Sequence, residues 1–294
     1  MKNNFTKLFL FLILAFINTN VIALEDFIFE SKSIEFEKNE NKIIAKDGVK
    51  VTTNDGLLIN AKDSIYDKNL RILDLIENVE IVDELQKIEI KSNKITYEKA
   101  IEKIFSDGLT KIKINEAHTI DGKNILFLRN DLIIFSDEMT SIKDNHGNML
   151  EVDGFRYSLE NKILRTDKLR FLDNLSNEYK SNNSLIDLNN NQIAAKDIQI
   201  YFAEGEMGQD ARLKGSSMIS EDEVTTISNG IFTTCKIRDD CPPWTFQSKE
   251  VIHNKKTKTI NYKNSLLKLY DIPVFYFPKF FHPDPTVKRQ SGFL

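Results

Sequence analysis

The sequence has 294 residues, of which 41% are hydrophobic and 29% are charged, and its formal net charge at pH 7 is −4. This length and apolar content allow a sizeable buried core, while the charged residues are spread along the chain rather than gathered in blocks. Because the balance is acidic and no Lys/Arg cluster is interleaved with aromatic residues, we do not expect nucleic acid to be a partner.

The N-terminal segment differs in composition from the rest of the chain. Lys2 and Lys7 precede an uncharged apolar run at residues 8–17, and residues 21–23 place small or modest side chains where a signal peptidase cleaves. The run is too short to cross a bilayer, which takes about 20 apolar residues. We therefore expect residues 1–23 to be a cleaved secretory signal peptide and the protein to be exported.

A repeat runs through the following part of the sequence. An aromatic or large apolar residue recurs every 30 or 31 residues, at Phe36, Tyr66, Tyr97, Phe127, Tyr157 and Leu188. After each of them comes a turn rich in charged residues or Asn, and then a second apolar run. Self-similarity at a fixed period of this size is typical of stacked supersecondary units, each too small to bury its own apolar face. The repeat predicts two-strand units stacked along the chain.

The pattern within each unit predicts which residues face inward. From Phe27 to Phe202, β-branched and aromatic residues alternate with charged ones. Side chains alternate between the two faces of a strand, so each repeated aromatic shares a face with the residue two before it. We predict a sheet pair with apolar inner faces, and such an interior would form a groove if a seam is open. The candidate groove residues are Ile34, Phe36, Tyr66, Ile95, Tyr97, Phe127, Phe155 and Tyr157. The pattern alone favours the interpretation that they fill a dry core, which is the usual role of such residues.

The chain contains two cysteines, Cys235 and Cys241, close together in sequence. In an exported protein an even number of cysteines indicates a disulfide. A zinc site would require two further ligands, and the nearest histidine in sequence is His253. We therefore favour a disulfide between the two cysteines over a metal pair.

The C-terminal part changes in composition. All six prolines lie between Pro242 and Pro285, and the stretch from Ile272 is rich in aromatic residues. Proline is excluded from central strand positions and helix interiors, so we expect an extended, rigid connector or an edge from Ile272 onward. The sequence stops on Gly292-Phe293-Leu294 without a turn or a charged cap, which suggests that the natural polypeptide continues.

Two features of the sequence resemble the LptD family of LPS-assembly proteins. The repeated step, as in Ile95-Thr96-Tyr97, is similar to the OstA-type repeats of the periplasmic lipopolysaccharide-transport proteins. The C-terminal block looks like the segment that leads into the β-barrel of that family, and its residues are Pro273, Tyr276, Pro278, Pro283, Ser291, Gly292 and Phe293. The expected organisation is a signal peptide at 1–23, an OstA-like periplasmic β-jellyroll at 24–270, and a connector with the start of a truncated outer-membrane barrel at 271–294.

This resemblance implies an all-β, elongated and twisted β-jellyroll without enzymatic activity. Its apolar groove would carry the acyl chains of lipopolysaccharide from a periplasmic bridge to the barrel of an outer-membrane protein. The implied partners are lipopolysaccharide, a periplasmic bridge jellyroll that pairs with the edge strand near Phe27–Phe36, and an outer-membrane lipoprotein plug reached through the missing barrel. Cys235 matches a family cysteine that pairs with the barrel, and Cys241 leaves that pairing open.

Enzyme motifs are absent from the sequence. It contains no Gly-x-Ser-x-Gly, no His-Glu-x-x-His, no phosphate-binding glycine loop and no metal-ligand cluster, so we expect no catalysis, cofactor or metal. The four histidines, His118, His146, His253 and His282, are isolated from one another in sequence. Two alternative functions stay open: a soluble lipopolysaccharide-bridge protein of the same fold, and a structural β-solenoid or adhesin.

Overall fold

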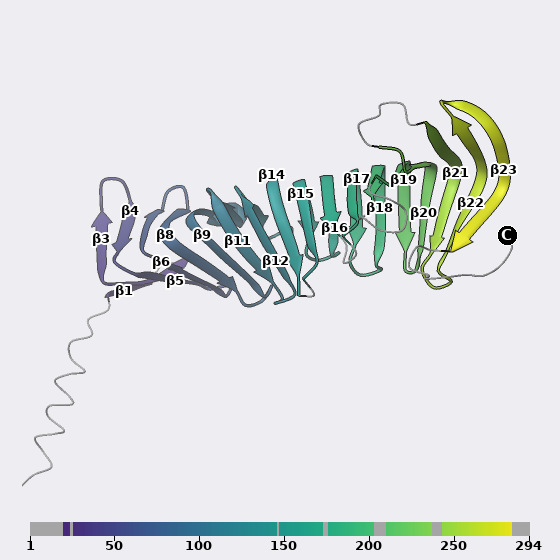
Figure 1. Cartoon of the computed structure of the whole chain (residues 1–294). Helices are drawn as coiled ribbons and strands as arrows, with labels where there is room; N and C mark the ends of the chain where they lie inside the picture. Colours follow the sequence, from purple (N-terminus) through teal and green to yellow (C-terminus); the bar gives the residue numbers. More distant parts are fainter. Residues whose placement is uncertain are drawn as a thin grey trace, which may run out of the picture. The chain divides into compact units, whose positions relative to one another are not determined.

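The structure is a computed structural model that describes residues 20–23, 26–145, 147–172, 176–202, 210–236 and 243–283. The chain divides into two compact units, Met1–Asp131 and Leu132–Leu294, here called unit 1 and unit 2. Both are built of antiparallel strands (Figure 1). The one helical element among these residues is a short 3-10 turn, Lys99–Ile101. The predicted all-β fold is confirmed.

The described residues of unit 1 form thirteen strands. They are β1 (Asn20–Ala23), β2 (Phe27–Ser31), β3 (Ser33–Glu37), β4 (Lys42–Lys46), β5 (Val49–Thr53), β6 (Leu57–Ala61), β7 (Asp63–Asp67), β8 (Ile72–Asp83), β9 (Ile88–Glu98), β10 (Lys103–Ser106), β11 (Leu109–Ile114), β12 (His118–Lys123) and β13 (Leu126–Leu128).

In unit 2 the described residues form ten strands of 10 to 12 residues each. They are β14 (Ile133–Asp144), β15 (Met149–Ser158), β16 (Ile163–Leu172), β17 (Glu178–Asp187), β18 (Gln192–Tyr201), β19 (Arg212–Glu221), β20 (Val224–Thr233), β21 (Trp244–Asn254), β22 (Thr259–Leu269) and β23 (Ile272–Pro283).

The strands of unit 1 form two layers. Layer A consists of β2, β5, β6, the second half of β8, the first half of β9, β11 and β12. Layer B consists of β3, β4, β7, the first half of β8, the second half of β9, β10 and β13. The purple and blue part of Figure 1 shows both, with β3 and β4 in layer B and β5 and β6 in layer A. The long strands β8 and β9 belong to both layers, so the chain passes between them at a corner.

The corner between the layers is set by residues that accept a left-handed backbone. In β8 the pairing shifts between Ile76 and Val79, where Glu77 and Asn78 have positive φ. Gly108 has a φ of +94° at the corner between β10 and β11, a conformation that side chains disfavour. Backbone bonds continue across the corner, as from Gly48 N to Lys62 O at 2.9 Å. Each strand can therefore bend without losing its partners.

The sequence repeat corresponds to one row of paired residues in layer B. Strand pairing places side by side Phe36, Ile43, Tyr66, Leu73, Tyr97, Ile104 and Phe127. The repeated aromatic thus falls on every second strand of the layer, at the same level. This confirms the stacked two-strand unit expected from the period.

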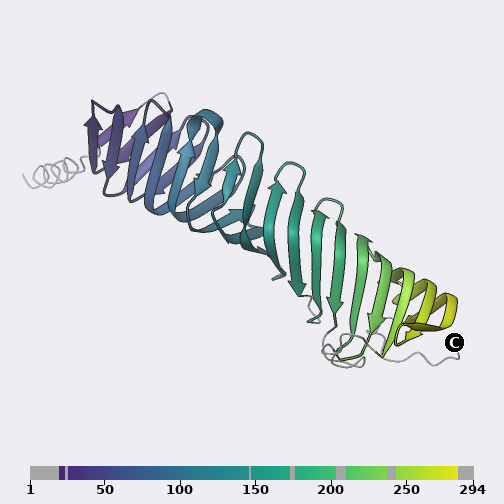
Figure 2. The ribbon, with the colours of Figure 1, turned by 90° about the horizontal axis from the view of Figure 1, so that it is seen from above.

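Unit 2 is a meander in which each strand from β14 to β23 pairs with the next. Figure 2 shows β14 to β20 running next to one another in teal and green. Several strands carry a positive-φ residue near the middle, including Gly154, Asn183, Asn229 and Asn264. Such bulges bend a strand and increase its twist.

The segments near the two ends of the chain compare differently with the predictions: the one from Ile272 is extended, as expected, whereas β2 is not the expected edge. The proline-rich stretch Ile272–Pro283 is the twelve-residue strand β23, paired along its length with β22. Among the described residues β22 is its strand partner, and an edge position tolerates proline. At the other end, β2 is not an edge, because it lies between β1 and β5.

Candidate functional site

Most of the predicted groove residues lie in the interior of their units. Ile95 and Tyr97 are 0% exposed, Phe127 is 1% and Tyr66 is 3% exposed in unit 1. In unit 2, Phe155 and Tyr157 are buried as well. The strand pairing brings the aromatic members of the unit 1 set onto one face, as the alternation predicted.

The two candidates nearest the N-terminus lie differently. Ile34 is half-buried on β3, and Phe36, on the same strand, is 47% exposed. The Phe36 ring is covered on one face by the Lys68 ammonium, 4.5 Å from the ring centroid. β3 has one strand partner within the described chain, β4, which explains the exposure of Phe36.

Aromatic rings fill the space between the two layers of unit 1. The Phe27 ring of layer A lies 4.9 Å from the Tyr66 ring and 5.9 Å from the Tyr97 ring of layer B, both in edge-to-face arrangements. Layer A also contains an apolar row of paired residues, each at most 2% exposed: Phe29, Val51, Ile59, Ile81, Ile90, Ile112 and Ile120. The interior of unit 1 is a packed apolar core.

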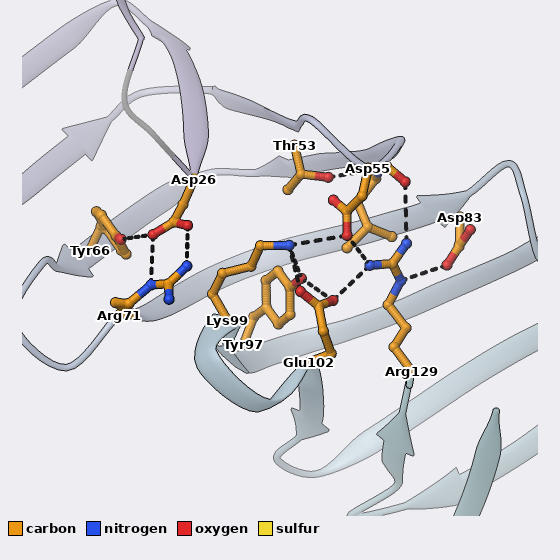
Figure 3. A network of polar contacts seen from close by, with 11 residues as sticks. Asp26, Thr53, Asp55, Tyr66, Arg71, Asp83, Tyr97, Lys99, Glu102 and Arg129 are labelled. Carbon is orange, nitrogen blue, oxygen red and sulfur yellow. Dashed lines mark hydrogen bonds and ion pairs between the residues drawn. The ribbon is translucent and has the colours of Figure 1, made fainter. Parts of the chain in front are cut away.

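Opposite the corner, charged side chains join the ends of the two layers at two places, which together we call the latch (Figure 3). At the first, Asp26, at the start of layer A, accepts hydrogen bonds from Tyr66 OH at 3.0 Å and Arg71 Nε at 2.9 Å. Arg71 also pairs with Asp26 through its Nη2 atom. Tyr66 lies on β7 of layer B, and Arg71 lies in the turn between β7 and β8.

The second part of the latch is centred on Arg129, in the turn after β13. Its Nε donates to Asp83 Oδ2 at 2.8 Å, and its Nη1 donates to Asp55 Oδ2 at 2.5 Å and Glu102 Oε2 at 2.7 Å. Lys99 Nζ reaches Asp55 Oδ2 at 3.0 Å. Asp55 follows β5 and Asp83 ends β8, both in layer A. Lys99, Glu102 and Arg129 lie in turns of layer B.

Burial and charge explain how these groups ionise. Burial raises the pKa of the Asp55 carboxyl, but hydrogen bonds from Thr53, Arg129 and Lys99 outweigh it and hold that pKa well below its ordinary value. The hydrogen bond from Arg71 likewise lowers the pKa of Asp26. Burial, together with the bond to Asp26, raises the pKa of Tyr66 to about 12. The carboxyl groups of Asp26 and Asp55 are therefore ionised at neutral pH.

Unit 2 contains a second apolar row that the sequence reading missed, here called the apolar ladder. Strand pairing places one apolar residue on each of its ten strands at the same level: Ile142, Leu150, Phe171, Tyr179, Ile200, Leu213, Phe232, Phe246, Leu267 and Phe275. A signal was present, because positions 142, 171 and 200 are equally spaced. It was hidden because the strands after Tyr201 are separated by sequence segments of unequal length.

The apolar ladder is more exposed than the matching row of unit 1. Ile200 and Leu213 are buried, at 6% and 8% exposed, while Tyr179, Phe232 and Phe246 are only partly buried against them. Phe275, on β23, is 65% exposed. Unit 2 therefore offers apolar side chains that are accessible without any rearrangement of its strands.

The row that carries the repeat changes character along unit 2. Ile134, Tyr157, Leu164, Ile186 and Ile193 are paired in turn, from β14 to β18. On the next three strands the row becomes polar, with Ser220, Thr225 and His253. The apolar ladder, in contrast, stays apolar to the last strand.

The remaining predicted residues lie partly outside the described chain. Cys235 is described, with its sulfur 3.7 Å from the backbone oxygen of Trp244, but Cys241 lies outside the described residues, so the disulfide stays a prediction. Pro273, Tyr276, Pro278 and Pro283 are on β23, where Tyr276 OH donates to Asn264 Oδ1 at 2.8 Å. Ser291, Gly292 and Phe293, His146 and most of residues 1–23 also lie outside. The described parts of the chain contain no group of acidic, His and Cys residues suited to a metal ion, and no helix able to span a bilayer.

An apolar interior between antiparallel layers, built from 30-residue units, defines a class of stacked β-jellyroll domains. Residues 15–126 match the family described as OstA-like protein. The N-terminal part of the chain is an OstA-like domain, and it coincides with most of unit 1.

The relatives of this part of the chain share one name. Over 102 residues, 34% of this chain, the sequence is 32% identical to the LPS-assembly protein LptD of Sodalis glossinidius (strain morsitans), of which the match covers 13%. The LPS-assembly protein LptD of Salmonella typhi gives the same identity and coverage. That of Yersinia pestis bv. Antiqua (strain Antiqua) is 37% identical over 70 residues, 24% of this chain and 9% of that protein. The chain thus matches about an eighth of the length of the first two relatives.

Proposed function

We propose that this protein takes part in lipopolysaccharide assembly at the outer membrane, as an exported domain whose apolar inner face carries acyl chains. The observation that supports this most strongly is the continuous apolar ladder of unit 2, in a chain whose N-terminal part is an OstA-like domain. Acyl chains require only continuous apolar area, worth about 25 cal/mol per Å² of surface removed from water. Such contacts are non-directional, so cargo can slide along the ladder.

Co-elution of lipid with the protein tests this function. The chain from Leu24 onward is mixed with fluorescently labelled lipopolysaccharide and passed over a gel-filtration column. We expect co-elution that unlabelled lipopolysaccharide displaces and that the matching core oligosaccharide, which lacks acyl chains, does not. Failure to co-elute, or equal displacement by the oligosaccharide, would contradict acyl-chain recognition.

The N-terminal edge supports a proposal about the bridging partner. β1 pairs with β2 over four residues, Asn20–Ala23, which belong to the predicted signal peptide. Cleavage after Ala23 would remove β1 and leave the edge of β2 free for a strand of another jellyroll protein. The lipoprotein plug and the pairing of cysteines with a barrel belong to the same proposal.

Crosslinking from the β2 edge tests the bridging partner. A photo-crosslinking residue in place of Glu30, on β2, should give an adduct with a purified soluble OstA-like periplasmic protein. The same residue in place of Lys113, on β11, serves as the control and should give none. Equal adducts at both positions would show that the contact is nonspecific.

A further inference from the structure

We propose that the outer face of the last three strands of unit 2, β21 to β23, is a docking surface for an anionic phospholipid bilayer. This surface, here called the basic face, lies on the side of the strands opposite to the apolar ladder. The proposal goes beyond lipopolysaccharide recognition, because the occupant is the headgroup layer of a membrane, and neither the ladder nor the edge of β2 takes part.

The described range 243–283 differs in charge from the chain as a whole. It contains seven lysines and two acidic residues, a net charge of +5, whereas the whole sequence has a net charge of −4. Among the described residues, Lys263 is the one lysine of this range that has an ion-pair partner, Glu250. The other six are Lys249, Lys255, Lys256, Lys258, Lys268 and Lys279. A local excess of lysines attracts an anionic surface.

The lysines of unit 1 are arranged differently. Lys62 binds Glu77 at 2.7 Å, and Lys94 binds Asp107 at 2.9 Å. Pairs of this kind cancel the charge of the surface locally. The positive excess of β21 to β23 is therefore a property of these strands and not of the repeated fold.

Strand pairing arranges the basic face in rows. The middle row carries charge, because Glu250, Lys263 and Lys279 are paired from β21 to β23. The rows on either side are apolar or aromatic at most positions. They consist of Gln247, Leu266 and Tyr276 on one side, and of Ile252, Asn261 and Phe281 on the other. Lysines and aromatic side chains thus share one surface.

These side chains do not belong to the interior of unit 2. On the inner face the Phe246 ring lies 5.2 Å from the Tyr262 ring and 5.7 Å from the Phe280 ring. Side chains alternate along a strand, so the neighbouring Phe281 points outward. Phe281 is 52% exposed and Tyr276 is 58% exposed. Both rings are available to a partner without any change in the core.

More apolar surface surrounds the turn between β22 and β23. Its exposed side chains are Leu269, Tyr270, Ile272 and Val274. Aromatic side chains next to lysines are typical of segments at a bilayer interface, where rings lie at the level of the headgroups and lysines bind lipid phosphates. Lysine is depleted in protein–protein interfaces, so this composition favours a lipid surface over a protein partner.

The backbone of β23 determines how deep this contact can be. Among the described residues β22 is its strand partner, and three of its positions are prolines, Pro273, Pro278 and Pro283. Prolines disfavour pairing with a further strand. Backbone groups left unpaired at the other edge require water and are costly in hydrocarbon. The strand therefore fits the hydrated headgroup layer and not the membrane core.

Sedimentation with vesicles that contain no lipopolysaccharide tests the proposal. The chain from Leu24 onward is mixed with vesicles of phosphatidylcholine alone, or of phosphatidylcholine with phosphatidylglycerol. We expect binding to the anionic vesicles to be at least about tenfold stronger, and to be lost at high salt. Equal binding to both kinds of vesicle, or binding to neither, would overturn the proposal. Tighter binding of soluble polyglutamate than of anionic vesicles would assign the face to an acidic protein and also overturn it.

This outcome is separate from that of the proposed function. The vesicles lack lipopolysaccharide, so vesicle binding can fail while lipopolysaccharide still co-elutes with the protein. The reverse result, vesicle binding without co-elution, would contradict the proposed function and support the basic face.

Charge reversal locates the binding surface. The double variant Lys268→Glu with Lys279→Glu should weaken binding to anionic vesicles at least about tenfold, since each lysine near such a surface contributes roughly fivefold. Lys143→Glu with Lys196→Glu, at exposed outward positions of β14 and β18, makes the same change in net charge and should weaken it less than about twofold.

An uncharged substitution tests the aromatic part of the face. Phe281→Ser should weaken vesicle binding about threefold, because it removes apolar surface without changing the charge. Circular dichroism confirms that each variant is folded. Equal losses in the two double variants, or wild-type binding in Phe281→Ser or in Lys268→Glu with Lys279→Glu, would refute the assignment.

Discussion

Arg129 links the two layers of unit 1 through three carboxyl groups. Burial opposes its charge, but the carboxylates of Asp83, Asp55 and Glu102 outweigh this and raise the pKa of the guanidinium. Asp83 is the most buried of the three, so removal of Arg129 would leave an uncompensated charge in the interior. The stability of unit 1 therefore depends on this side chain more than on its exposed ion pairs.

Arg129→Met tests this dependence. We expect the free energy of unfolding of unit 1 to fall by about 3 kcal/mol, the cost of leaving a buried carboxylate unpaired. Arg170→Met in unit 2 is the matched control, since Arg170 also binds two carboxylates but is 45% exposed, and it should cost less than about 1 kcal/mol. Chemical denaturation of both variants measures the difference, and equal losses would contradict it.

Acid should destabilise unit 1 through the latch. The pKa values of Asp26 and Asp55 are lower in the folded chain than the ordinary value of 3.8. Their stabilising contribution is therefore complete above that value and is lost as pH falls through the lower folded pKa values. We expect the melting temperature to drop below about pH 4, and to drop less steeply in Asp55→Asn. Parallel curves for the wild type and the variant, in a series of melts at different pH, would exclude this role of Asp55.

At the scale of elements, small residues allow the strands of unit 2 to pack on their inner face. A Cβ atom on Gly215 of β19 would lie 2.4 Å from Ile227 Cγ2 and 3.3 Å from the backbone oxygen of Ser228. One on Gly230 of β20 would lie 2.7 Å from Val251 Cγ2. The side chains of Ile227 and Val251 thus occupy the space above these glycines and join the core that supports the ladder.

Gly215→Ala should destabilise unit 2. The Ile227 methyl group is fixed by its branched side chain and cannot swing away, so the strands must shift, at a cost of about 1–3 kcal/mol. Lys214→Ala, at the exposed neighbouring position, controls for local effects and should change stability little. Thermal melts of the two variants decide the matter, and an unchanged melting temperature for Gly215→Ala would show that the space is not needed.

At the scale of the whole molecule, the two units bury their apolar rows to different degrees. In a stacked architecture, stability is the sum of local units and their nearest neighbours. Loss of the latch should therefore act mainly on unit 1.

Hydrogen exchange tests this local effect. In Arg129→Met, amide exchange should accelerate in residues 26–131 and change much less in residues 147–283. Mass spectrometry of peptides from both ranges measures it. An equal acceleration in both units would mean that the chain unfolds as a single cooperative body.

The local pattern of the sequence was enough to predict the strands and one apolar row. Alternation and the 30-residue period placed Tyr66, Tyr97 and Phe127 on one face at one level, because both depend only on neighbours along the chain and on a regular repeat. The apolar ladder was missed beyond Tyr201, where sequence segments of unequal length between the strands break the period while strand pairing continues.

The sequence by itself determined that this chain is a stack of two-strand units with one apolar face, since side-chain alternation is a property of each strand alone. Only the tertiary structure decided which apolar rows are enclosed and which are accessible. That outcome depends on where each strand bends and on contacts between residues far apart, such as Arg129 with Asp55, 74 positions away. Neither the bend nor such a pair follows from local sequence, because both are set by the packing of one layer against another.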